Sequence, residues 1–241
     1  MKDDPPAAAG WRFDELGHAG AEHLDAAYIA AYERKAGYDP APDVARFRAL
    51  GLDRAATLVD LGCGTGVFAL AIAPFCRRVV AVDVSPSMIA ALRSRAEHQG
   101  VTNLEPVRAG FLTYAHRGQP ADFVFSRHAL HHLPDFWKAI ALARIARILR
   151  PGGVFQLRDL FYSFSLFEAD RALEGWLGRA SERPDVGWTR TELETHIREE
   201  HSTFTWLLEA MLERAGFVIR AREYSESQTY AAYTCTRAPL R

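Results

Sequence analysis

The pattern of apolar and polar positions divides the chain near residue 57. Before it, residues 22–35 and 42–50 repeat apolar side chains at helical spacing, so we expect two helices there. After it, short apolar runs alternate with helical segments, which is typical of βαβ units that share one parallel sheet. The chain therefore predicts an α/β domain preceded by a short helical region.

The alternation predicts five strands, the helices between them and a final hairpin. We expect the strands at residues 57–61, 78–83, 103–108, 122–125 and 154–158. We expect helices at residues 67–74, 87–98, 135–149 and 204–215, and hairpin strands at residues 217–224 and 229–236. Along the helix at residues 135–149, one apolar stripe should face the sheet, formed by Phe136, Ile140, Ile145, Ile148 and Leu149.

A segment at about residues 160–202 interrupts this alternation and is rich in aromatic and charged residues. We expect it to contain helices at residues 167–179 and 192–200 and to form a helical lid inserted after the fifth strand. Ligands bind beyond the carboxyl ends of parallel strands, so Tyr162 and Phe164 should line an acceptor pocket. Residues 1–20 are expected to be a flexible tail, and residues 21–241 one domain.

Composition limits the cellular location and the binding partners that we expect for the protein. Lysine and arginine number 29 against 30 acidic residues, so no electrostatic attraction to nucleic acid or to an anionic membrane is predicted. The three cysteines form no C-x-x-C pair, which argues against a disulfide framework and a metal site. The first residues lack the pattern of a signal peptide, and no apolar run is long enough to span a membrane. We expect a cytoplasmic protein.

The clearest chemical signal is the sequence LVDLGCGTG at residues 58–66, a strand that passes into a glycine-rich turn before a helix. Glycine allows close backbone approach to a ligand, and a helix N-terminus presents free N–H groups. Asp83 ends the next strand, where a carboxylate can accept hydrogen bonds from both ribose hydroxyls. Together these elements predict a cofactor that contains adenosine.

Two classes of cofactor fit this pattern. Gly64, Gly66 and Ala69 also satisfy the dinucleotide fingerprint, which leaves a nicotinamide-dependent reductase as an alternative. A carboxylate at Asp60 would repel a pyrophosphate but would attract an ammonium or a sulfonium. The chain also ends in one helix and a hairpin, without the second domain that a dehydrogenase usually has. These features favour a methyl donor.

Four blocks together resemble the class I S-adenosylmethionine-dependent methyltransferases over roughly residues 57–236: DLGCGTG at 60–66, Asp83, HHL at 131–133 and RPGG at 150–153. The resemblance implies a Rossmann-like three-layer fold, in which a mostly parallel seven-stranded sheet ends in an antiparallel hairpin. It implies that residues 62–66 surround the methionine part of the donor, that Asp83 binds the ribose, and that Val84 and Met88 flank the adenine. The expected cofactor-binding residues are Asp60, Gly62, Cys63, Gly64, Gly66, Asp83, Val84, Met88, Gly110, Phe111 and Arg127.

One position departs from the family pattern. Many members carry, after the third strand, an acid that contacts the adenine amino group, but this chain has Gly110 there. We expect the backbone and Phe111 to make that contact instead. Of the histidines, His131 and His132 are assigned to a loop-to-helix turn common in the family. His128 lies closer to the end of the fourth strand, and whether it lines the pocket is left open. A general base among them is one interpretation, and the catalytic residue stays unassigned.

The expected reaction is in-line methyl transfer, which depends mainly on alignment of the reactants and requires no dedicated catalytic residue. The sequence SRHA at residues 126–129 lacks the motif with which relatives hold an amino group of adenine or glutamine, and no proline-cysteine nucleophile occurs there. A small-molecule acceptor is therefore preferred. RNA is the alternative acceptor, and a donor-binding subunit without activity is a further possibility. The sequence leaves the oligomeric state open.

Overall fold

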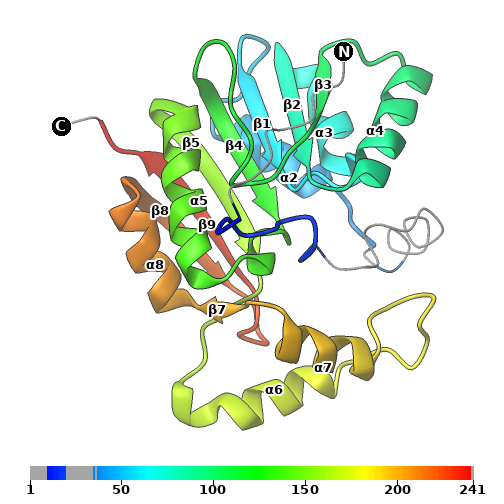
Figure 1. Ribbon diagram of the computed structural model, residues 1–241, viewed down its shortest axis with the longest axis vertical. Helices are drawn as coiled ribbons and strands as arrows, with labels where there is room; N and C mark the ends of the chain where they lie inside the picture. Colours follow the sequence, from blue (N-terminus) through cyan, green and yellow to red (C-terminus); the bar gives the residue numbers. More distant parts are fainter. Residues whose placement is uncertain (1–9, 20–34, 36, 240–241) are drawn as a thin grey trace.

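A seven-stranded sheet forms the centre of the computed structural model, which describes residues 10–19, 35 and 37–239 (Figure 1). Its strand order is β3-β2-β1-β4-β5-β9-β8. The first five strands are parallel, and β9 runs antiparallel to both of its neighbours. The predicted mostly parallel sheet with an antiparallel ending is confirmed. Its strands are β1 (Thr57–Leu61), β2 (Arg78–Asp83), β3 (Leu104–Arg108), β4 (Ala121–Arg127), β5 (Leu149–Asp159), β8 (Phe217–Tyr224) and β9 (Ala231–Arg237).

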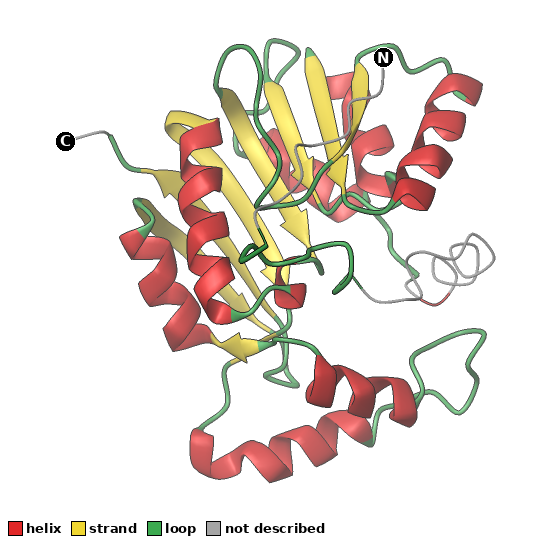
Figure 2. Ribbon diagram, viewed as in Figure 1, coloured by secondary structure: helices red, strands yellow, loops and turns green. Residues whose placement is uncertain are grey.

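Helices cover both faces of the sheet and complete the three layers (Figure 2). Each face of the sheet has its own hydrophobic core. Every residue of β1 is therefore buried, whichever face its side chain points to. Ser85 starts α4 as its N-cap, accepting a hydrogen bond from the Met88 N–H at 3.2 Å. One face carries α2 (Ala41–Ala49), α3 (Val67–Ile72), η2 (Ala73–Phe75) and α4 (Pro86–His98), and the other carries α5 (Asp135–Ile148) and α8 (Thr205–Arg214).

The apolar stripe predicted for α5 is wrong in its first half. Phe136 and Ile140 are 67% and 41% exposed, whereas Leu142 and Ile145 are fully buried. The buried face thus lies to one side of the predicted stripe, because apolar residues surround most of this helix and the spacing alone did not select the inner ones. The strand β5 also begins earlier than predicted, at Leu149, with a register irregularity against β4 where the RPGG sequence lies.

The insertion after β5 forms two helices, α6 (Ala169–Leu177) and α7 (Arg190–Glu199), as predicted. They lie below the carboxyl ends of the strands in Figure 1 and share a small core of their own, with Trp176 and Leu193 in it. A two-stranded parallel pair, β6 (Phe161–Tyr162) and β7 (Thr203–Phe204), closes the base of the insertion. Two short turns of helix, η3 (Leu130–His132) and η4 (Leu166–Glu168), complete the described elements.

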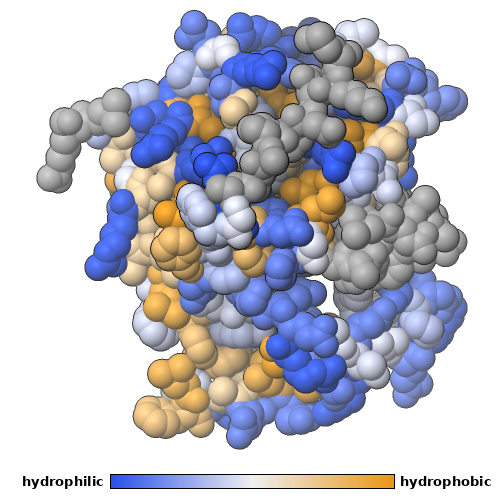
Figure 3. Space-filling view, viewed as in Figure 1, coloured by the Kyte–Doolittle hydropathy of each residue, from blue (hydrophilic) through white to orange (hydrophobic). Residues whose placement is uncertain are grey.

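Apolar surface gathers over the start of α6, at the lower left of Figure 3. Leu166 and Phe167, which lead into that helix, are 59% and 100% exposed. None of the helices in the described part of the chain is long and apolar enough to span a membrane.

Residues 10–19 belong to the stretch expected to be a flexible tail, yet they pack against the domain. The rings of Trp11 and Trp137 stack at 6.2 Å, and Phe13 joins the core around α5. The predicted helix at residues 22–35 lies outside the described residues, apart from Lys35.

Candidate functional site

A cavity of about 310 Å³ opens where β1, β2 and β4 end, at the point where the strand order reverses. This is the place where open α/β sheets bind ligands. Of the predicted cofactor-binding residues, all but Gly66 line it: Asp60, Gly62, Cys63, Gly64, Asp83, Val84, Met88, Gly110, Phe111 and Arg127. The fold thus gathers residues from four separate segments around one cavity.

The three glycines of the turn have different roles. All have positive φ, at +75° for Gly62, +53° for Gly64 and +81° for Gly66. A Cβ at Gly62 would overlap Ala129, and one at Gly66 would overlap Leu92, so packing requires these two glycines. A Cβ at Gly64 would meet no described atom within 4 Å, so this glycine, which lines the cavity, is not required by packing among the described residues.

Asp83 is held rigidly at the end of β2. One of its carboxylate oxygens accepts a hydrogen bond from the Gly64 N–H at 2.9 Å, and the other accepts one from the Ser85 N–H at 2.9 Å. A carboxylate offers about four lone-pair sites, so it has the capacity to accept further bonds from a diol. The fixed orientation prepares Asp83 for that role.

Asp60 is a buried acid of a different kind, since its side chain is almost completely shielded at the end of β1. Burial raises its pKa well above the usual range, and the carboxylates of Asp83 and Asp43 raise it further. Within the described residues no hydrogen-bond donor contacts this carboxylate. A cationic group in the cavity would therefore stabilise its charge.

Glu15 was not predicted from the sequence, yet it lines the cavity beside Gly110. A Cβ at position 110 would overlap the Glu15 carboxylate, which accepts a hydrogen bond from the Leu112 N–H at 3.1 Å. Burial raises the pKa of Glu15 to about 7, opposed by the N–H groups of Leu112 and Phe111. An acid from the N-terminal segment thus lies beside Gly110. The expectation that the backbone and Phe111 make the adenine contact stays a prediction.

Tyr38 and Arg127 form the opposite wall of the cavity. The guanidinium carbon of Arg127 lies 3.9 Å from the centre of the Tyr38 ring, within range of a cation–π interaction. The Tyr38 hydroxyl donates to Asp43 at 2.7 Å, which fixes the ring. Tyr38, like Glu15, was missed because its neighbours in sequence carry no recognisable motif.

His128 lines the cavity in an uncommon backbone conformation, with φ of +50°. Its Nε2 atom is buried and has no hydrogen-bond partner among the described residues. Burial, together with the charge of Arg127, lowers the pKa of His128 to about 3. The imidazole is therefore neutral at physiological pH and is a weak base.

The other two histidines of this segment, His131 and His132, have different surroundings. His132 lines the cavity, whereas His131 points into a network with Asp159 and Glu200. Both belong to the short turn η3, as the family pattern implied.

The insertion contributes nothing to the cavity lining among the described residues. Tyr162 and Phe164 stack on each other at 5.0 Å, and Phe164 meets Phe204 at 5.6 Å. The hypothesis that these two aromatic residues line an acceptor pocket is not supported by their placement, because they pack the base of the insertion instead. If Tyr162 and Phe164 do not recognise the acceptor, the sequence favours Tyr28 and Tyr32 of the predicted helix at residues 22–35, which lie outside the described residues.

Comparison with known proteins gives one family. A family model described as "Methyltransferase domain" matches residues 58–153. The chain is 38% identical over 109 residues to trans-aconitate 2-methyltransferase from Azoarcus sp. (strain BH72), which covers 44% of this chain and 40% of that protein. It is 30% identical over 131 residues to a ubiquinone biosynthesis O-methyltransferase from Methylobacterium sp. (strain 4-46), covering 52% and 51%. The alignments thus span about half the length of these curated relatives or less.

A solved structure shows the same fold over nearly the whole chain. Magnesium protoporphyrin IX methyltransferase from Synechocystis PCC 6803, with bound SAM, superposes with a TM-score of 0.65 at 14% identity. The superposition covers 95% of this chain and 100% of that one. The likeness confirms the predicted Rossmann-like architecture.

Proposed function

This chain belongs to the class I S-adenosylmethionine-dependent methyltransferase family, and on that premise we propose that it transfers a methyl group from S-adenosylmethionine to a small-molecule acceptor. The observation that carries the proposal is the pair of carboxylates at neighbouring strand ends. Asp60 is buried without a hydrogen-bond donor among the described residues, and Asp83 is oriented by two backbone N–H groups. Such a pair suits a ligand with a cationic end and a diol.

Different cavity residues bind different parts of the donor. Asp60 faces the ammonium of the methionine part, beside the backbone of Gly64, and Asp83 accepts hydrogen bonds from the ribose. Val84, Met88 and Phe111 supply apolar surface for the adenine ring. Glu15 lies in the corner where the family pattern places an acid, so its carboxylate is the acceptor for the adenine amino group.

When bound, the donor supplies a methyl group on a sulfonium whose positive charge disappears during transfer. The protein has to hold the acceptor in line with that methyl group, and alignment of this kind contributes up to about 7–11 kcal/mol. Burial and the nearby Asp83 and Asp60 raise the pKa of Cys63 well above its usual range. The thiol therefore stays protonated and does not compete with the acceptor as a nucleophile.

His128 is assigned to acceptor binding rather than to proton removal. Its low pKa makes it a poor general base, but its unpaired Nε2 is a hydrogen-bond acceptor for a hydroxyl or amino group when the ring carries its proton on Nδ1. Two of the similar proteins are named for small molecules, namely trans-aconitate and magnesium protoporphyrin IX. The net charge of −1 gives no support for RNA as the acceptor. A cytoplasmic location completes the proposal.

A thermal-shift experiment tests the donor. S-adenosylhomocysteine at a hundred times its dissociation constant should stabilise the protein by about 2.7 kcal/mol, because only the folded state binds it. NAD and NADP at the same concentrations should leave the melting temperature unchanged. Stabilisation by a nicotinamide cofactor without stabilisation by S-adenosylhomocysteine would overturn the proposal.

The acceptor is found by a transfer assay with radiolabelled donor. A panel of carboxylic acids, phenols and amines is compared with total RNA at low salt. Incorporation of label into a small molecule supports the proposal, and incorporation only into RNA contradicts it.

A further inference from the structure

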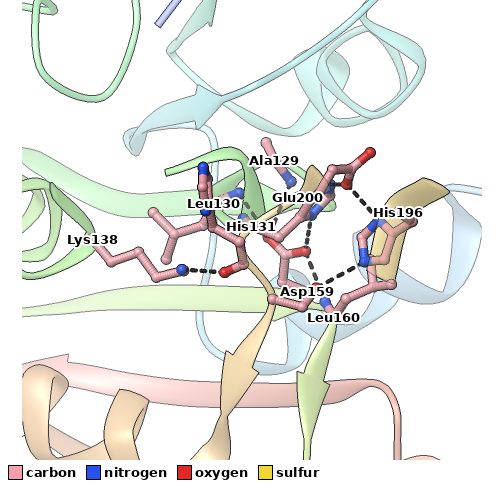
Figure 4. Close-up of polar contacts among 10 residues, drawn as sticks. Ala129, Leu130, His131, Lys138, Asp159, Leu160, His196 and Glu200 are labelled. Atoms are coloured by element: carbon pink, nitrogen blue, oxygen red, sulfur yellow. Dashed lines mark hydrogen bonds and ion pairs between the residues drawn. The ribbon is translucent and has the colours of Figure 1, made fainter. Parts of the chain in front are cut away.

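A cluster of two imidazoles and a carboxylate lies outside the donor cavity, where the insertion meets the sheet (Figure 4). His131 comes from η3 after β4, and His196 and Glu200 come from α7 and the residue that follows it. One ligand atom from each of the three residues lies within 4.8 Å of the others. From the sequence we expected no metal. His196 and Glu200 are only four residues apart, but His131 is distant from them in sequence, and only the fold brings the three together.

The two imidazoles converge on one oxygen of the Glu200 carboxylate. Nε2 of His131 lies 2.9 Å from Oε2 of Glu200, and Nδ1 of His196 approaches the same oxygen. Among the described residues, that oxygen is buried without a partner in hydrogen-bond geometry. One nitrogen of each ring thus lies against the same carboxylate oxygen, and the three ligand atoms are close enough together to reach one ion.

In each imidazole, the ring nitrogen that does not face Glu200 already has a polar partner. Nδ1 of His131 donates to Asp159 at 2.5 Å, and Nε2 of His196 lies 2.8 Å from the hydroxyl of Ser202. In metal sites, a histidine ligand almost always gives its other ring N–H to a carboxylate or a similar acceptor, which fixes the tautomer and the ring orientation. The two histidines here have such partners in place.

Asp159 is suited to this supporting role because its own position is fixed. Its carboxylate accepts hydrogen bonds from the N–H groups of Leu130 at 2.7 Å and Leu160 at 2.8 Å, and also from those of Ala129 and His131. Its side chain is completely buried. A carboxylate so held keeps the proton of His131 on Nδ1 and leaves Nε2 directed at the cluster.

We propose that His131, His196 and Glu200 bind a divalent cation of the zinc type. Two imidazole nitrogens and one carboxylate oxygen are a ligand set that zinc accepts, with a remaining position for water or another ligand. The side chains of His131 and His196 are 7% and 11% exposed, and that of Glu200 is 23% exposed, so the site is shielded but has an entry path beside Glu200.

The ion would join two parts of the molecule. On one side is η3, in which His132, the residue after His131, lines the donor cavity. On the other side is the insertion, which already touches η3 through the His201 N–H, bonded to the His131 carbonyl at 3.0 Å. A bound cation thus fixes the insertion against the carboxyl edge of the sheet, next to the cavity.

Zinc titration of the full chain tests this proposal. The protein is treated with a chelator, dialysed, and titrated with zinc chloride in competition with a chromogenic chelator. We expect one zinc ion per chain. His196→Ala and Glu200→Gln should each weaken binding by more than about 100-fold, since loss of a supporting partner alone costs roughly 10–100-fold. The matched control His98→Ala removes an exposed histidine at the end of α4 and should bind zinc as the parent does.

Cobalt substitution gives a second readout. The chelator-treated parent protein should develop visible absorption bands with one equivalent of cobalt, and His196→Ala should not. Less than stoichiometric zinc in the parent, or unchanged affinity in both variants, would overturn the metal site and leave His131 as an imidazolium between two carboxylates. Binding of S-adenosylhomocysteine is measured on the same zinc-free protein, so failure of the metal site is distinguished from failure of the proposed function.

Discussion

The donor cavity and the inserted helices meet at the same edge of the sheet, but they are held by different forces. Around the cavity, short segments at the strand ends position the functional groups through neighbouring backbone, as the N–H groups of Gly64 and Ser85 position Asp83. The insertion is attached by contacts between residues far apart in sequence, including His131 with Glu200 and Lys138 with the carbonyl of His201.

Substitutions in the two regions should therefore affect different properties, ligand binding in one and stability in the other. Loss of a group in the cavity should weaken ligand binding while the fold remains, because the strands and the turn support themselves. Loss of a group in the buried network leaves charged or polar partners uncompensated, which lowers stability. The following predictions test that separation.

The largest effect is expected for Asp159→Ala. The substitution removes a fully buried carboxylate that accepts hydrogen bonds from several backbone N–H groups and pairs with His131. Breaking a buried pair of this kind costs about 3–5 kcal/mol. Urea denaturation measures the change in the free energy of unfolding. Arg183→Ala, in the exposed pair with Asp185, is the control and should change it by less than about 1 kcal/mol. Equal effects of the two variants would contradict the account.

The second prediction concerns Asp83→Ala. Hydrogen bonds to a charged group contribute about 1.5–3 kcal/mol each, so donor affinity should fall at least about tenfold. The stability of the unliganded protein should change less than in Asp159→Ala. Calorimetry with S-adenosylhomocysteine gives the affinity, and an unchanged value in the folded variant would place the ribose elsewhere.

For Glu15 we expect a smaller effect on the free energy of unfolding, and this effect should depend on pH. Its pKa rises from 4.5 to about 7 in the folded protein, mainly through burial. Between these pH values the folded state keeps a proton that the unfolded chain releases, so the contribution of Glu15 to stability is complete below the lower value and is lost as the pH rises through the upper one.

Glu15→Gln removes this titration. The variant should therefore be more stable than the parent at pH 8, by on the order of 1 kcal/mol after allowance for solvent screening, and the difference should shrink or reverse at pH 5. Chemical denaturation at the two pH values measures it. A difference independent of pH would show that Glu15 is ionised throughout.

The smallest effect is expected when a residue of the insertion is substituted and donor affinity is measured. Phe164→Leu keeps an apolar side chain in the aromatic cluster and lies outside the cavity lining. Effects of separate sites are independent to within about 0.3–0.5 kcal/mol, so donor affinity should stay within about twofold. A larger loss, measured by the same calorimetry, would mean that the two regions are coupled.

The sequence predicted most of the fold because the sheet is encoded locally. Short apolar runs bounded by glycine, proline and polar residues identified all five parallel strands, and the turn at residues 58–66 located the cavity. The inner face of α5 was misjudged because the helix is apolar on several sides, and only packing against the sheet decides that Leu142 is buried and Phe136 exposed.

The missing site residues share one physical cause. Glu15 and Tyr38 reach the cavity from the N-terminal part of the chain, and His131 meets Glu200 only after the insertion folds back onto η3. No spacing rule connects such positions, since each contact depends on the path of the chain in three dimensions. The one hint was negative: Gly110, where an acid was expected, left a space that Glu15 fills.

The most direct test of the donor assignment is a crystal structure with S-adenosylhomocysteine. We predict that the ligand lies in the cavity at the ends of β1 and β2, with both ribose hydroxyls within about 3.2 Å of the Asp83 carboxylate. We also expect the ligand ammonium beside Asp60 and the adenine amino group beside Glu15. A ligand bound with its ribose away from Asp83, or outside this cavity, would contradict the donor assignment.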